Sequence, residues 1–185
     1  MKKQPAVAAT TRTSRVSSRH PLKKKNVHFS SGRQNWKTPP KIIRPTEAVL
    51  GVIDLDPCSP IVPNIPARRF FTEEINGLRQ PWYGNVFMNP PYKSCIWWIK
   101  KILREYRAGR VKEAIILVAA RTETKAFHLL RSFPMCFIKG RLKFSGSKNT
   151  ATFPSVAIYL GPNARKFHQE FKHLGVVMLE WNPEA

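Results

Sequence analysis

The sequence contains few cysteines and no long apolar run. Its three cysteines are widely spaced and form no Cys-x-x-Cys pair, which argues against a disulfide framework and against a zinc site. No apolar stretch approaches the roughly 20 residues needed to span a bilayer. We therefore expect reduced, partly buried thiols, no bound metal and no membrane segment, in a chain whose 185 residues suffice for one domain.

Acidic residues are scarce as well. Eleven Asp and Glu stand against 32 Lys and Arg, and the formal net charge is +21. The first 44 residues contain 12 of the basic residues and no acid. This excess is too large for an ordinary cytosolic enzyme of small metabolites, and it indicates a polyanionic partner, nucleic acid before a membrane surface.

Residues 1–25 are polar and basic and show no hydrophobic periodicity. We predict a disordered, basic N-terminal arm here, followed by a single domain over 26–185. An organelle transit peptide is the alternative, because the segment has Arg, Ser and Thr without acids. The three lysines at 23–25 and the lack of an apolar face favour a nucleic-acid-binding arm.

The remainder alternates apolar runs with amphipathic segments. Strands are predicted over 52–56, 85–88, 114–119, 135–138, 153–160 and 176–179. Helices are predicted near 45–50, 94–108, 124–130 and 163–173. The stretch 61–84 looks irregular. This alternation predicts one α/β domain with a mostly parallel sheet covered on both faces.

Two helix starts are predicted from single residues. Pro45 suits a first helical turn, with Glu47 near the positive end of the helix. Ser94 is a good N-cap for the next helix. The apolar face of that helix comprises Cys95, Trp98, Ile99, Ile102, Leu103 and Tyr106. Its basic side comprises Lys100, Lys101, Arg104 and Arg107.

Polar turns follow several of the predicted strands. They are Asp56-Pro57-Cys58 after 52–56, Asn89-Pro90-Pro91-Tyr92 after 85–88, Arg121 after 114–119, and Arg141 and Lys143 after 135–138. Carboxyl ends of parallel strands form the ligand-binding edge of an open α/β sheet, so these turns are expected to lie together. Consecutive prolines lack backbone N–H groups and continue neither strand nor helix, so the turn after 85–88 is rigid. With 16 prolines in the chain, a turn that only reverses direction is the alternative.

The ordered series of segments resembles the phage-type, Dam-like family of DNA N6-adenine methyltransferases. The segments are VHFSS and WKTP within 27–39, DLDPCS at 54–59, GLRQPW at 77–82, FMNPPY at 87–92, AARTET at 119–124, IKGRLKF at 138–144 and FPS at 153–155. The resemblance covers about residues 26–160. It implies a Rossmann-like methyltransferase fold, a three-layer sandwich around a mostly parallel mixed sheet, with S-adenosylmethionine as methyl donor. It also implies a cytoplasmic, nucleoid-associated protein encoded by a bacterium or phage.

The resemblance implies a catalytic role for the turn at 89–92. The Asn89 side-chain oxygen and the Pro90 carbonyl would accept the two N6–H bonds of an adenine flipped out of double-stranded DNA. Pro91 would keep the turn rigid, and Tyr92 would stack on the base. No strong general base is required, because the methylated amine can lose its proton afterwards.

The resemblance also implies a cofactor site. Asp56, with Pro57 and Cys58 in the same turn, would hold the methionine end of S-adenosylmethionine or a water beside it. Thr38 and Pro39 would cover the same moiety.

DNA contacts are expected from the basic residues at the same edge. Arg121, Arg141 and Lys143 would contact phosphates or bases. Sequence specificity is expected from loops such as 61–84 and 145–152, because no separate target-recognition domain is visible.

The sequence departs from the wider superfamily after the first strand, where 58–60 reads Cys-Ser-Pro instead of a glycine-rich loop. The ribose-binding acid is open between Glu73 and Glu74. Two other functions are open. One is methylation of RNA or of a protein glutamine, and the other is a catalytically silent DNA-binding protein on the same fold.

Overall fold

The structure, a computed structural model, describes residues 37–144 and 151–179. The predicted arm over 1–25, the segment 27–31 and most of the loop at 145–152 lie outside the described residues. Among the helices that are described, none has both the length and the apolar character needed to cross a membrane.

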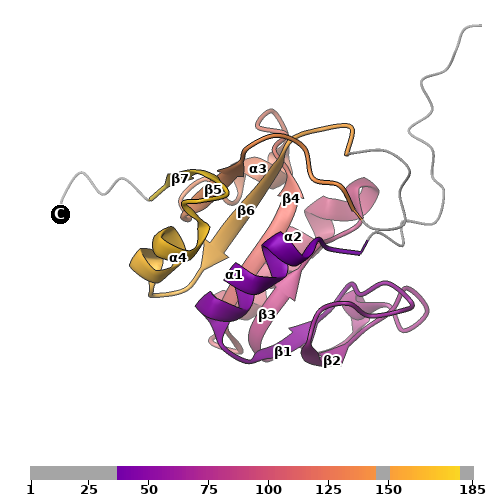
Figure 1. Cartoon of the computed structure of the whole chain (residues 1–185). Helices are drawn as coiled ribbons and strands as arrows, with labels where there is room; N and C mark the ends of the chain where they lie inside the picture. The colour runs from indigo at the N-terminus through magenta and orange to yellow at the C-terminus, as the bar shows by residue number, and fades with distance from the viewer. Residues whose placement is uncertain (1–36, 145–150, 180–185) are drawn as a thin grey trace, which may run out of the picture. The chain divides into compact units, whose positions relative to one another are not determined.

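A seven-stranded mixed sheet forms the centre of the domain (Figure 1). Its strands are β1 Ile53–Asp56, β2 Ala67–Phe70, β3 Gly84–Met88, β4 Val111–Ala119, β5 Met135–Ile138, β6 Ser155–Leu160 and β7 Gly175–Met178, in the order β2-β1-β3-β4-β6-β5-β7. The neighbouring strands β2 and β1, β1 and β3, and β3 and β4 pair in parallel. Strand β6 is antiparallel to both β4 and β5, and β7 is antiparallel to β5. Strand β5 therefore ends at the same edge of the sheet as β4, and β6 begins there.

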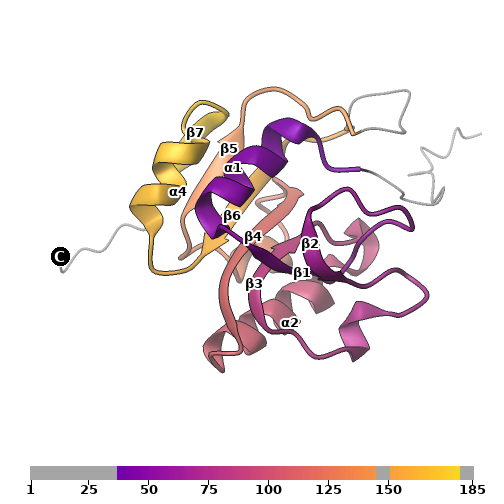
Figure 2. The ribbon, with the colours of Figure 1, turned by 60° about the horizontal axis from the view of Figure 1, so that its bottom comes forward.

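Helices cover both faces of this sheet. They are α1 Pro40–Leu50, α2 Cys95–Arg107, α3 Lys125–His128 and α4 Ala164–Phe171, with 3-10 turns η1 Gly77–Arg79 and η2 Tyr92–Ser94. One core layer joins α1 and α4 to alternate residues of β4, Ile115 and Leu117. The other joins α2 to Ile116 and Val118, the residues between them. Figures 1 and 2 show α1 and α2 on opposite sides of the strands. The predicted three-layer, Rossmann-like α/β sandwich is confirmed.

Helix α1 begins at Pro40, so the predicted start at Pro45 is wrong. The N–H groups of Ile42 and Ile43 bond to the Pro39 carbonyl at 2.9 and 3.3 Å. Pro40 fits the first turn because that turn has no use for its missing N–H. Pro45 is buried inside the helix. Helix propensity alone disfavours that placement, and packing against the sheet and α4 overrides it.

Helix α2 has the predicted extent, but Ser94 does not cap it. The Ser94 hydroxyl instead accepts a hydrogen bond from Trp98 Nε1 at 3.3 Å, and η2 leads directly into the helix. Lys101 was predicted on the exposed basic side, yet only 9% of it is exposed. Its partners are described below.

The edge strand β2 lies in the stretch that was expected to be irregular. Its side chains are mostly exposed, so it lacks the apolar alternation that signals a half-buried strand. Backbone bonds fasten its end to the neighbouring turn: Phe71 N–H donates to the Asp56 carbonyl, and Ser59 N–H donates to the Phe71 carbonyl, both at 2.9 Å.

Candidate active site

Two of the predicted site segments meet at the carboxyl edge of adjacent strands. Asp56 ends β1, Asn89 follows β3, and these strands pair in parallel through Leu55 and Val86. Burial raises the pKa of the Cys58 thiol well above its usual value, and the neighbouring backbone of Asn89 offsets part of that rise. The turn after β1 therefore contacts the Asn-Pro-Pro-Tyr turn directly.

Asp56 is almost fully buried, with 3% of its surface exposed. Its Oδ1 accepts a hydrogen bond from Cys58 N–H at 3.2 Å. Burial raises the pKa of the Asp56 carboxyl to about 7, and the Cys58 amide and the nearby Ser59 hydroxyl offset only part of that effect. Within the described ranges, no Lys or Arg forms an ion pair with it. The turn thus offers a buried carboxyl that a bound cationic group would hold in its ionised form.

The loop after β1 reaches back to the segment that precedes α1. Asn64 donates from Nδ2 to the Thr38 carbonyl at 2.7 Å, and Thr38 and Pro39 are both buried. The other polar atom of that amide, Asn64 Oδ1, is buried and has no hydrogen-bond partner in the described part of the chain. Ser59 Oγ lies near Asp56 but likewise makes no hydrogen bond of acceptable geometry there. Buried acceptors left unsatisfied are costly, which fits a region that receives a polar ligand.

The Asn-Pro-Pro-Tyr turn presents its residues to different depths. Asn89 and Tyr92 are half-buried, Pro90 is buried and Pro91 is exposed. The Tyr92 ring meets Phe153 nearly at right angles, with centroids 4.7 Å apart and planes at 87°. Burial raises the pKa of the Tyr92 hydroxyl, so the ring stays neutral.

Phe153 is the site residue that was not singled out from the sequence. It lies just before β6, and the Pro154 carbonyl beside it accepts a hydrogen bond from Ala120 N–H at 2.9 Å. An antiparallel strand begins at the edge where its parallel neighbour ends, so the residues before β6 reach the same edge as the turn after β4. The Phe-Pro-Ser segment at 153–155, which belongs to the family resemblance, was the signal that could have identified Phe153.

The three predicted DNA-contacting residues are exposed at the same edge. Arg121 follows β4 and pairs with Glu123 at 3.0 Å, an exposed ion pair of small energetic weight. Arg141 and Lys143 follow β5 and alternate with the buried Leu142. The acids Glu73 and Glu74 follow β2 and are exposed as well. The structure does not choose between these two as a ribose-binding acid.

The geometry agrees with a match to a known family. The family described as DNA N-6-adenine-methyltransferase (Dam) matches residues 25–178. The chain belongs to this family. The matched stretch includes every described element from α1 to β7. No sequence among the curated proteins matches the chain.

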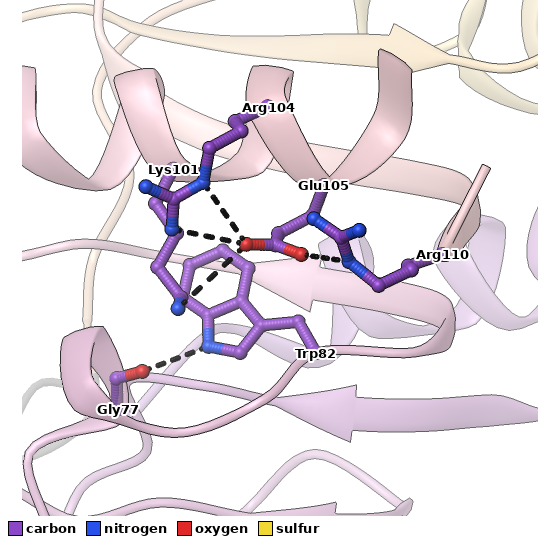
Figure 3. A network of polar contacts seen from close by, with 6 residues as sticks. All are labelled: Gly77, Trp82, Lys101, Arg104, Glu105 and Arg110. Atoms are coloured by element: carbon purple, nitrogen blue, oxygen red, sulfur yellow. Dashed lines mark hydrogen bonds and ion pairs between the residues drawn. The ribbon is translucent and has the colours of Figure 1, made fainter. Parts of the chain in front are cut away.

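In this Dam-family protein a polar network links α2 to Trp82 and Gly77 (Figure 3). Glu105 in α2 is buried and pairs with Arg104, Arg110 and Lys101. Burial alone would raise the pKa of Glu105, but the bonds from Arg110 and Arg104 outweigh it and hold the pKa below its usual value. Lys101 Nζ also lies 5.1 Å from the Trp82 ring centroid, a cation–π contact.

The same network ends against the candidate cofactor turn. Trp82 Nε1 donates to the Gly77 carbonyl at 2.8 Å (Figure 3). Gly77 in turn packs on Pro57 so closely that a Cβ there would lie 2.0 Å from the Pro57 carbonyl oxygen. Contacts therefore run without a gap from α2 through Trp82 and Gly77 to the end of β1. In the described ranges, no three His, Cys, Asp or Glu side chains gather as a metal site would require.

Proposed function

We propose that this protein transfers a methyl group from S-adenosylmethionine to the N6 amino group of adenine in double-stranded DNA. The observation that carries the proposal is the parallel pairing of β1 and β3, which brings the turn of the buried Asp56 and the Asn-Pro-Pro-Tyr turn to the same edge of the sheet. Membership of the Dam family supports the reaction class. The net charge of +21 supports a nucleic-acid substrate.

The residues at the end of β1 fit the cofactor. When bound, S-adenosylmethionine supplies an electrophilic methyl group on a sulfonium. Asp56 would hold the amino group of its methionine end, because the carboxyl is buried and lacks a cationic partner in the described part of the chain. Pro57 and Cys58 would shape the floor of this position, and the buried Thr38-Pro39 segment would cover it.

The turn at 89–92 fits the acceptor base. The N6 lone pair of adenine is delocalised into the ring, so the amino group must be fixed and its lone pair localised. The Asn89 side-chain oxygen and the Pro90 carbonyl would accept the two hydrogen bonds from the N6 amino group. These bonds would both fix the amino group and localise its lone pair. Tyr92 would stack on the base for roughly 1–3 kcal/mol, which helps offset the cost of flipping it out. The contact with Phe153 would restrain the orientation of the Tyr92 ring.

Direct assay of methyl transfer tests this function. Unmethylated duplex DNA is incubated with cofactor labelled on the methyl group, and adenines are analysed for N6-methyladenine. We expect transfer by the wild type and a loss of about 100-fold or more in Asn89→Ala, since a positioning and charge-stabilising contact is removed. Thermal unfolding of Asn89→Ala is the control for folding. Equal transfer by wild type and variant would contradict the roles assigned to the turn.

Substrate alternatives are separated by the acceptor supplied. RNA and glutamine-containing protein are offered under the same conditions as DNA, because an Asn-Pro-Pro-Tyr turn suits any planar nitrogen. Label in either acceptor, with none in DNA, would replace adenine in DNA as the substrate. Binding of DNA without binding of S-adenosylmethionine, measured by calorimetry, would indicate a silent member of the family. As an enzyme that acts on DNA, the protein would work in the cytoplasm of a bacterium or of a phage-infected host.

A further inference from the structure

A continuous exposed stripe runs from η2 along helix α2, and the proposed site does not use it. The stripe begins at Lys93 in η2 and continues at helical spacing through Trp97, Lys100, Arg104 and Arg107 of α2, all exposed. The one acid of α2, Glu105, is buried in the network of Figure 3 and neutralises nothing on this stripe except Arg104. The stripe is therefore basic over its whole length.

Trp97 is the unusual member of this stripe, because 59% of it is exposed. Its neighbour Trp98 is buried and stacks on Trp82, with ring centroids 5.9 Å apart. Those two indoles pack in the core, and Trp97 does not. Trp97 meets Lys100 instead, whose Nζ lies 5.0 Å from the ring centroid. Trp is enriched at interaction surfaces, and its ring offers a flat face on which a base can stack.

We propose that Lys93, Trp97 and Lys100 form a second DNA contact, which grips the duplex backbone beside the flipped adenine. This rests on the proposed function, since Lys93 directly follows Tyr92 of the candidate active site. The two ammonium groups pair with phosphates, and the indole packs on a sugar or base of the adjoining nucleotides. Charge complementarity commits the surface to DNA, because Lys is depleted in protein–protein interfaces whereas duplex DNA presents one negative charge per roughly 1.7 Å of axis.

Position along α2 divides the stripe into a contacting and a distant part. At about 1.5 Å rise per residue within α2, Arg107 lies roughly 10 Å along the helix from Lys100 and roughly 15 Å from Trp97. Arg104 is bound by Glu105 at 3.1 Å. The contact therefore involves the first two turns of α2. Arg107, which is also exposed and positively charged, serves as the matched control at the far end of the helix.

Salt-dependent DNA binding by the full chain tests this surface. Affinity for one unmethylated duplex is measured over a series of salt concentrations for wild type, Lys93→Ala, Lys100→Ala, Trp97→Ala and Arg107→Ala. Each lysine variant is expected to reduce the slope of log affinity against log salt by about 1, since each phosphate contact contributes about 0.9. Trp97→Ala is expected to weaken binding by about tenfold with the slope unchanged, and Arg107→Ala to change neither.

The outcomes separate this surface from the methylation activity. Unchanged slopes in both lysine variants, or an equal loss in Arg107→Ala, would overturn the DNA contact even if the wild type methylates adenine. Reduced slopes in a wild type background that transfers no methyl group would uphold the contact and reject the activity. Trp97→Phe, which keeps a stacking ring, should recover part of the binding lost in Trp97→Ala. Thermal unfolding of every variant shows that the fold is kept.

Discussion

At the scale of single residues, Asp56 combines burial with a lack of compensating positive charge in the described structure. Its pKa of about 7, against an ordinary value of 3.8, means that the folded protein prefers the protonated carboxyl. At pH values between 3.8 and about 7, folding is therefore accompanied by the uptake of a proton by Asp56. The contribution of Asp56 protonation to folding stability is complete below the pKa of the unfolded chain, and it is lost as the pH rises through about 7.

This sign gives a prediction for Asp56→Asn, which removes the titration and keeps the shape. In the absence of cofactor, the wild type should lose stability between pH 4 and pH 7 more steeply than the variant, by a few kcal/mol at most. Urea unfolding at a series of pH values measures both slopes. Parallel curves for the two proteins would show that Asp56 ionises normally.

Cofactor binding should release the proton that Asp56 holds in the folded protein. If Asp56 holds the amino group of S-adenosylmethionine, the bound state favours the ionised carboxyl. Affinity should then rise as the pH approaches 7, and binding below pH 7 should release close to one proton. Calorimetry in two buffers of different ionisation enthalpy counts that proton. Asp56→Asn is the matched control and should release none from this position.

Phe153 is expected to act on the acceptor side of the site alone. Phe153→Ala removes the perpendicular contact with Tyr92, a type of pair worth about 0.5–1.5 kcal/mol. We expect kcat/KM for DNA to fall by up to about tenfold while the dissociation constant of S-adenosylmethionine is unchanged. Steady-state kinetics and calorimetry give the two quantities. Equal weakening of both would place Phe153 in general packing instead.

At the scale of elements, α2 depends on the charge balance around Glu105. Glu105→Gln leaves Lys101 buried without its anionic partner, and breaking such a pair costs a few kcal/mol. Because Arg104 and Arg110 are partly exposed and can turn to solvent, we expect a loss of about 2 kcal/mol in the free energy of unfolding. Urea denaturation measures it. Arg107→Gln on the same helix should change stability by less than about 0.5 kcal/mol.

Elements with strong apolar patterns could be predicted from the sequence. The run that became β4 and the apolar face of α2 were foreseen because burial on two faces or on one helical stripe leaves a direct mark. The edge holding Asp56 and Asn89 followed from the order of strands and turns. Edge strand β2 was missed because its exposed side chains carry no such mark.

The remaining errors concern tertiary contacts. Local sequence predicts Lys101 at the surface. Its burial is compensated by the ion pair with Glu105 and the cation–π contact with the Trp82 ring. The start of α1 was misplaced because Pro45 normally disfavours a helix interior, and packing decides otherwise. Phe153 depends on the antiparallel direction of β6, which local patterns do not reveal.

At the scale of the whole molecule, charge should set how the protein finds DNA. Residues 1–25 contain eight Lys and Arg and no acid. Deleting them should lower the salt slope of DNA binding by several units and weaken binding most at low salt. The rate of methyl transfer at saturating DNA should stay the same, because the described site lies within 37–153. An unchanged slope would show that the arm makes no phosphate contacts.

The order of the sheet also constrains how the chain assembles. Strand β6 lies between β4 and β5, although β5 precedes it in the sequence. Strand β5 therefore cannot join the sheet until β6, which lies between it and β4, has been synthesised. A nascent or truncated chain that stops before residue 155 would leave the central, apolar β4 as an open edge, which is a template for aggregation. Strands β5, β6 and β7 therefore complete the sheet after the first four strands have been synthesised, and Phe153 reaches Tyr92 only once β6 has paired with β4.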